Sequence, residues 1–212
     1  MTRSISITGL RRVVAGTAAG VLAVAAVLTT GGAASADTTL TIRYPVTGTT
    51  HLATPNADVP LGPGHLKATA DLNTGAIKAT LTLPDATGSF TELGIIPVTA
   101  TVRLINNGPT TGTLDINTGA VTTTSMITMR IVDLKVAGID LPVGSACQTS
   151  TPVSVMLSSQ PGFNILKGGT FAGTYTIPKF ANCGLNTLLI NLTVPGSGNT
   201  ITFTLGKGKV IS

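Results

Sequence analysis

Two histidines and one aspartate, His51, His65 and Asp58, are the residues whose types could support acid–base or metal chemistry. Imidazole nitrogens and a carboxylate can share a divalent metal, or the carboxylate can orient an imidazole that moves a proton. Their spacing fits no such motif, and the sequence contains no HExxH, GxSxG, CxxC or Walker loop. We interpret both histidines as solvent-facing and predict no catalytic, cofactor-binding or metal-binding residues.

Asp133 and Asp140 flank the turn KVAGID, where two carboxylates could contribute to a calcium site. Calcium takes about six to eight oxygen ligands, which come from several carboxylates and carbonyls close together. Two aspartates do not supply that set. We therefore interpret them as surface residues of a turn.

Residues 1–36 have the features of a secretory signal peptide. Three arginines precede an uncharged run from Val13 to Leu28, and an A-x-A cleavage site ends at Ala36. The run is shorter than the roughly 20 residues that a spanning helix needs. We predict cleavage between Ala36 and Asp37 and one domain over residues 37–212, secreted to the cell envelope or medium, with no transmembrane segment.

Cys147 and Cys183 are the only cysteines of the chain. An even number of cysteines in an exported chain favours a disulfide over free thiols, because the compartment is oxidising. Both lie at predicted strand–loop boundaries, so we predict a disulfide with Cα atoms about 4.4–6.8 Å apart. Arg11-Arg12 partly matches a twin-arginine signal, but a protein oxidised outside gains little from folding inside, and we favour general secretion.

The charge pattern gives no support for nucleic-acid binding. Removal of the leader leaves ten basic and eight acidic residues, a net charge of +2, with no Lys/Arg cluster. The seven aromatic residues are scattered through the sequence. A nucleic-acid surface needs clustered cations interleaved with stacking rings.

Threonine-rich alternating segments predict strands. Threonine makes up 33 of the 176 residues after the leader, and its branched Cβ fits a half-buried pleated sheet. Apolar residues recur with a period of two, as one wet face requires. The predicted inward sets include Leu40, Ile42, Tyr44; Leu66, Ala68, Ala70; Ile77, Ala79, Leu81; Val98, Ala100, Val102, Leu104; Ile127, Met129, Ile131; Val153, Val155, Leu157; Phe171, Gly173, Tyr175, Ile177; and Ile201, Phe203, Leu205.

The pattern DLNTGAI, which begins at Asp71, recurs as DINTGAV forty-four residues later. A one-residue slip would send a strand's apolar side chains to the wrong face, so the loop must keep the alternation in phase. We predict a hairpin in which Leu72 faces Ile77 and Asp71 faces Lys78. Its four-residue loop has Gly75 in the left-handed conformation, and the second copy repeats this turn.

These features predict an all-β fold, an antiparallel β-sandwich or partly closed barrel of about nine or ten strands. Leucines at positions 185, 188, 189 and 192 recur at helical spacing. We therefore expect one short helix near residues 184–192, with another buried strand as the alternative.

Carbohydrate binding has little support, because sugar platforms usually use exposed aromatic faces. The chain has no tryptophan, and four of its aromatic residues fall on predicted inward positions. Phe90, Phe163 and Phe180 remain as loop candidates.

The leader, the stretch ADVPLGPGHLKATADLNTG and the stretch YTIPKFANCGLNTLLINLTVPGSGNTITFTL resemble small secreted proteins of high-GC Gram-positive, or actinobacterial, bacteria. The resemblance covers nearly all of the chain after the leader. It implies a secreted all-β domain and says nothing about catalytic residues.

We expect a non-enzymatic secreted binding protein or cell-envelope protein. Within it, the apolar stretch Leu185–Val194 is where we expect a lipid or protein partner to bind. The alternative is a hydrolase whose site is assembled from residues distant in sequence, with His51, His65 and Asp58 as its nucleus.

Overall fold

The computed structural model describes residues 38–92 and 94–211. The predicted signal peptide and its cleavage site between Ala36 and Asp37 lie outside these residues. Within them the chain forms strands and one short helical segment, η1 (Gly184–Asn186) followed by α1 (Thr187–Thr193). The strands are β1 (Thr39–Leu52), β2 (Ala57–Asp71), β3 (Ala76–Thr82), β4 (Ala86–Glu92), β5 (Ile96–Asn106), β6 (Thr110–Leu114), β7 (Val121–Val136), β8 (Ile139–Asp140), β9 (Gln148–Thr149), β10 (Val153–Ser159), β11 (Gly169–Ile177), β12 (Phe180–Ala181), β13 (Gly196–Leu205) and β14 (Lys209–Val210).

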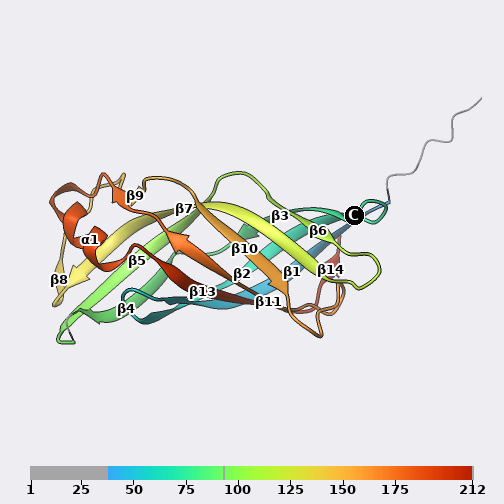
Figure 1. Cartoon of the computed structure of the whole chain (residues 1–212), viewed down its shortest axis with the longest axis horizontal. Coiled ribbons are helices and arrows are strands. Elements are labelled where there is room, and N and C mark those ends of the chain that lie inside the picture. Colours follow the sequence, from blue (N-terminus) through green and yellow to red (C-terminus); the bar gives the residue numbers. More distant parts are fainter. Residues whose placement is uncertain (1–37, 93, 212) are drawn as a thin grey trace, which may run out of the picture. The chain divides into compact units, whose positions relative to one another are not determined.

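Eight antiparallel strands close into a barrel in the order β10-β11-β13-β1-β2-β3-β6-β7, and pairing of β10 with β7 completes the ring (Figure 1). The other strands lie outside this ring. β5 pairs with the second part of β7 and carries β4 on its far edge. The predicted all-β fold and the predicted helix are therefore confirmed, and the pairing gives a closed barrel. No helix among the described residues has both the length and the apolar character needed to cross a membrane.

The barrel interior holds the predicted apolar alternation. On β1 the buried side chains are Ile42, Tyr44 and Val46, and on the neighbouring β13 they are Ile201, Phe203 and Leu205. Threonines occupy many of the intervening positions and face outward. Facing threonines on adjacent strands form hydroxyl pairs, such as Thr41 with Thr69 at 3.0 Å and Thr113 with Thr122 at 3.0 Å. Such cross-strand pairs each stabilise a sheet by about 0.2–1 kcal/mol.

The repeated turn has the predicted loop length but a different register. Ala70 faces Ile77, and Thr69 rather than Asp71 faces Lys78. The carboxylate of Asp71 instead accepts hydrogen bonds from the backbone N–H groups of Asn73 and Thr74, at 2.8 and 3.1 Å. This local capping ends β2 at Asp71, leaves Leu72 in the loop and lowers the pKa of the Asp71 carboxyl. The predicted pairings of Leu72 with Ile77 and of Asp71 with Lys78 are therefore wrong.

The second copy repeats the turn closely. Asp115 accepts from Asn117 N–H at 2.8 Å and from Thr118 N–H at 3.2 Å, and Leu114 faces Val121. Gly75 and Gly119 both have positive φ, +73° and +75°. The predicted reuse of one turn in two hairpins, with a left-handed glycine, is confirmed.

Alanine substitutions at the two repeated glycines will have unequal effects. A Cβ at Gly75 would lie 2.2 Å from the Leu114 carbonyl oxygen, whereas a Cβ at Gly119 has no heavy atom within 4 Å. Gly119→Ala therefore incurs only backbone strain, about 1 kcal/mol, while Gly75→Ala must also displace β6 and should lose about 3 kcal/mol. Urea unfolding of the two variants checks this, and equal losses would contradict the assigned packing.

Candidate functional site

The structure brings together only part of the predicted histidine site. His51 and Asp58 face each other on β1 and β2, and His51 Nδ1 lies 2.8 Å from Asp58 Oδ1. His65 faces Pro45, six residues away from His51 along β1, which corresponds to about 20 Å of strand. No group of three or more His, Cys, Asp or Glu residues within 38–92 and 94–211 is arranged to hold a metal ion. The geometry provides a surface-exposed pair without a second imidazole.

The two aspartates at the KVAGID turn have different neighbours, and Asp140 forms an ion pair. Asp140 Oδ1 lies 2.8 Å from Lys135 Nζ, and this contact, with a smaller contribution from Asp133, raises the pKa of the Lys135 ammonium group. Asp133 faces Thr101 on β5. The turn therefore carries a neutralised surface pair.

Of the three phenylalanines predicted to lie in loops, only Phe163 does, because Phe90 belongs to β4 and Phe180 to β12, and none forms an exposed aromatic platform. Phe180 is buried, Phe90 is partly buried, and Phe163 packs edge-to-face against Phe171 with ring centroids 4.9 Å apart. Tyr44 and Tyr175 are buried on inward positions, as predicted, and burial raises the pKa of Tyr44 to about 12.

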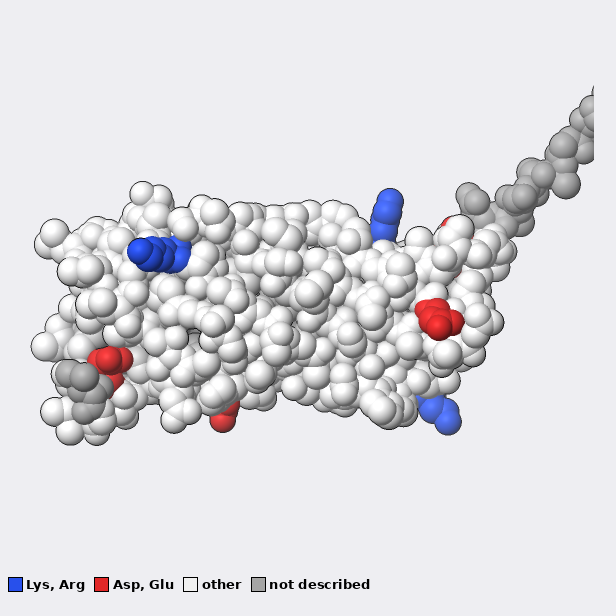
Figure 2. Space-filling model, viewed as in Figure 1, with Lys and Arg blue, Asp and Glu red and all other residues white. Residues whose placement is uncertain are grey.

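Figure 1 shows α1, β8 and the connection between β4 and β5 at the same end of the molecule. Each of these segments carries exposed aliphatic side chains. We call this group the apolar tip. Its members have relative exposures between 66% and 101%: Ile95, Ile139, Leu185, Leu188 and Leu192. The segment from Cys183 to Gly198 contains no charged residue. Figure 2 shows that the charged side chains on the face drawn are few and widely spaced. The helical part of the tip is thus an uncharged aliphatic surface, while Ile139 adjoins Asp140, which is paired with Lys135.

The underside of α1 faces strands β4, β5 and β7 across a small cavity. The cavity has a volume of about 80 Å³ and is lined by residues of both the helix and the sheet. Ile190 and Leu189 of the helix line it together with Glu92, Ile96 and Val136 of the sheet. Ile96 follows Ile95 in sequence, and Val136 pairs with Ile139. The buried Ile190 thus holds the helix against the sheet, while Leu185, Leu188 and Leu192 face away.

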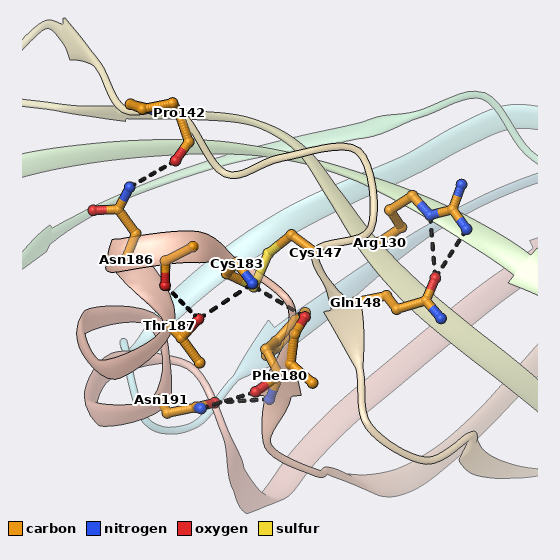
Figure 3. The surroundings of a disulfide bond; sticks show 11 residues. Arg130, Pro142, Cys147, Gln148, Phe180, Cys183, Asn186, Thr187 and Asn191 are labelled. Atoms are coloured by element: carbon orange, nitrogen blue, oxygen red, sulfur yellow. Dashed lines mark hydrogen bonds between the residues drawn. A yellow bond between two sulfur atoms is a disulfide. The ribbon is translucent and has the colours of Figure 1, made fainter.

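The predicted disulfide is formed and fixes the base of this helix (Figure 3). The Cα atoms of Cys147 and Cys183 are 4.3 Å apart, just below the expected range, and both residues are fully buried. The bond joins the loop before β9 to the residue that precedes η1. The helix therefore starts from a covalently fixed point.

Hydrogen bonds hold the rest of the helical segment. Asn191 accepts from the Phe180 N–H at 2.7 Å and donates to the Phe180 carbonyl at 2.9 Å (Figure 3). Asn186 donates to the Pro142 carbonyl at 2.8 Å, and the Thr187 hydroxyl accepts from the Cys183 N–H at 3.2 Å. A seven-residue helix is too short to persist in water by itself, so these contacts position its leucines.

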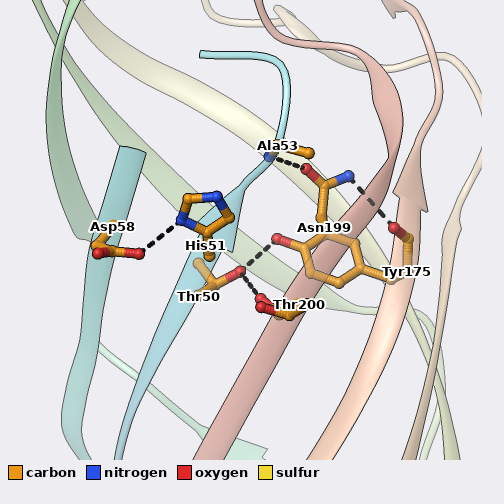
Figure 4. Close-up of polar contacts among 7 residues, drawn as sticks. All are labelled: Thr50, His51, Ala53, Asp58, Tyr175, Asn199 and Thr200. Carbon is orange, nitrogen blue, oxygen red and sulfur yellow. Dashed lines mark hydrogen bonds and ion pairs between the residues drawn. The ribbon is translucent and has the colours of Figure 1, made fainter. Parts of the chain in front are cut away.

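A buried polar cluster joins the neighbouring barrel strands β1, β13 and β11 (Figure 4). Asn199, which is fully buried, accepts from the Ala53 N–H at 3.0 Å and donates to the carbonyls of Tyr175 and Gly196 at 3.2 and 2.8 Å. The Thr50 and Tyr175 hydroxyls lie 2.6 Å apart. Because every polar atom of the Asn199 side chain has a partner within the protein, we assign this cluster a structural role.

Sequence reasoning located the leucines of the apolar tip but missed Ile95 and Ile139. Each follows a glycine with positive φ, Gly94 or Gly138, and this combination of a turn with an aliphatic residue is the signal that could have identified them. The Asn199 cluster had no signal in the spacing of polar residues.

Comparisons with known proteins add no relative. No protein-family model, no curated protein and no solved structure matches the chain significantly. The resemblance to small secreted actinobacterial proteins therefore stays a prediction.

Proposed function

We propose that this protein is a secreted, non-enzymatic component of the cell envelope that attaches to a lipid surface through its apolar tip. The observation that carries the proposal is the exposure of five aliphatic side chains from three segments at one end of the molecule. Single exposed leucines are ordinary, whereas several at one end favour a surface that is covered in use.

The chemistry of the tip favours lipid over a protein partner. Its side chains are only leucine and isoleucine, and the helical segment carries no charge. Cores of protein interfaces are enriched in aromatic residues, methionine and arginine, which the tip lacks. Aliphatic side chains on a rigid protrusion can enter the boundary between headgroups and acyl chains, where each buried methylene contributes about 0.8 kcal/mol.

The signal-peptide features and the disulfide support the compartment. A leader with an A-x-A site directs export, and a disulfide persists where the environment is oxidising. Arrival outside the membrane would bring the tip to lipid or to the envelope. The resemblance to actinobacterial secreted proteins is consistent with this location.

Removal of the tip leucines will abolish vesicle binding. The triple variant Leu185→Ser, Leu188→Ser and Leu192→Ser loses the aliphatic surface, so its partition coefficient on phosphatidylcholine vesicles should fall at least about a hundredfold. Wild-type binding should change less than about twofold between low and high salt, or when anionic lipid is added, because the tip has little charge to screen. Cosedimentation with vesicles measures both effects.

A matched control uses exposed apolar residues in the turns at the opposite end of the barrel. Leu72→Ser, Ile116→Ser and Leu166→Ser remove three exposed side chains there and should leave binding unchanged. If this control loses binding and the tip variant retains it, the lipid surface lies at the opposite end of the barrel, and the proposal is wrong. Wild-type protein that fails to bind vesicles but forms a stable complex with one envelope protein would replace lipid by a protein partner.

A further inference from the structure

A second cavity, similar in volume to the first, lies within the barrel and away from the apolar tip. Its volume is about 90 Å³, and all but three of its twenty lining residues are hydrophobic. It lies among the inward faces of the barrel strands and is completed by the loop between β10 and β11. Small barrels usually fill their interior with side chains, so a hollow of this size needs a cause.

The cause is a group of small residues on two adjacent strands. Ala68 and Ala70 of β2 and Ala79 of β3 all face inward, and Ala68 pairs directly with Ala79. Many of the other inward positions that line the cavity carry a larger side chain, such as leucine, isoleucine or phenylalanine. Three short side chains side by side leave the space that larger ones would occupy.

Apart from the Tyr44 hydroxyl, the side-chain hydroxyls of the lining residues belong to two adjacent strands. They are those of Thr110 on β6 and of Thr123 and Ser125 on β7. The Thr110 and Ser125 hydroxyls lie 2.7 Å apart. A pair of hydroxyls uses only one of its two hydrogens for its own bond, so the second can donate to another acceptor. No charged side chain lines the cavity.

The β10–β11 loop is held in place as the remaining wall. Phe163 and Ile165 of this loop line the cavity. The Tyr44 hydroxyl donates to the Ile165 carbonyl at 2.5 Å, and the Gly208 N–H donates to the Leu166 carbonyl at 3.0 Å. The cavity is therefore a formed space with one hydroxyl-bearing side.

We propose that this cavity binds a small uncharged amphiphile, a short alkyl chain with one hydroxyl or carbonyl group that contacts Thr110 and Ser125. The chain would fill the space beside the three alanines, and the polar group would use the unpaired hydroxyl hydrogen. A cavity of about 150 Å³ accommodates benzene, which has six carbons, so this smaller one suits a ligand of about four non-hydrogen atoms, a chain of roughly two or three carbons with its polar group. A carboxylate or ammonium would be excluded, since it would be buried without a counter-charge.

Titration with 1-propanol tests the proposal by NMR of the alanine methyl groups. We expect saturable shifts at Ala68, Ala70 and Ala79 with a dissociation constant on the order of 10 mM. Propionate and propylammonium should bind at least about tenfold more weakly. Thr110→Val with Ser125→Ala should weaken 1-propanol binding by about three- to tenfold while the protein stays folded.

Filling the cavity provides the decisive variant. Ala79→Leu should abolish 1-propanol binding, whereas Thr80→Leu, which adds a leucine one residue along on the exposed face of β3, should not change it. Ala68→Leu replaces Ala79→Leu if the latter fails to fold. Absence of saturable shifts in the wild type, or equal binding by the filled and control variants, would overturn the proposal. This result does not depend on the apolar tip, so the two proposals fail separately.

Discussion

Replacing Cys147 and Cys183 by serine will lower the free energy of unfolding by about 4 kcal/mol. The bond closes a loop over a sequence separation of 36 residues, and the chain-entropy model gives this value as an upper guide. For a domain of this size, the melting temperature should fall by roughly 8–16 °C. Because the Cys183 end fixes the start of η1, the loss should also loosen the helix that carries the apolar tip.

Two measurements separate these effects. Thermal unfolding by circular dichroism should give the lower melting temperature with unchanged strand content in the folded variant. Hydrogen exchange should show faster exchange at the helical amides, including Val194 N–H, which donates to the Ile190 carbonyl. Reduced wild-type protein is the matched control and should behave as the double variant does. A loss below about 1 kcal/mol would show that the bond contributes little to holding this region.

Asn199→Ala will destabilise the protein by about 3–5 kcal/mol. The substitution leaves the Ala53 N–H and the carbonyls of Tyr175 and Gly196 without their side-chain partner. An unpaired buried polar group costs about 1–3 kcal/mol, and Asn199 is fully buried. Urea unfolding measures the loss. Asn186→Ala removes one exposed hydrogen bond to the Pro142 carbonyl and, as control, should lose about 1 kcal/mol or less.

Asn199→Asp gives the same cluster a pH signature. The carboxylate would face two carbonyl oxygens in a buried site, so its pKa in the folded state should rise above the unfolded value. A raised folded-state pKa means that the folded protein binds more protons, and stability falls as pH rises. The destabilisation relative to wild type should therefore be larger at pH 7 than at pH 4. An equal penalty at both values would contradict the assigned contacts.

The sequence predicted the features that depend on local pattern. Alternating apolar residues placed Ile42, Tyr44 and Phe203 inside the sheet, and the cysteine count with the leader predicted the disulfide. Leucine spacing located the helix. These predictions succeed because side-chain period and turn chemistry are properties of a few neighbouring residues.

Features that depend on distant residues were not accessible in this way. The hairpin register failed because the Asp71 carboxylate caps its own loop, which outweighs a surface charge pair with Lys78. Barrel closure depends on pairing of β10 with β7, and the cavity depends on Ala68 lying beside Ala79. Neither neighbour relation follows from alternation alone.

A single tryptophan at the apolar tip tests the proposed lipid attachment most directly. The chain has no tryptophan, so Leu188→Trp introduces one emission signal without background, and Ile116→Trp places the same reporter in the β6–β7 turn, just after the end of β6. With phosphatidylcholine vesicles, we predict that the emission of the Leu188→Trp protein shifts to shorter wavelength and is quenched by brominated acyl chains. The emission of the Ile116→Trp protein should stay unchanged. An unaltered signal at position 188, or quenching at position 116 instead, would contradict attachment through the tip.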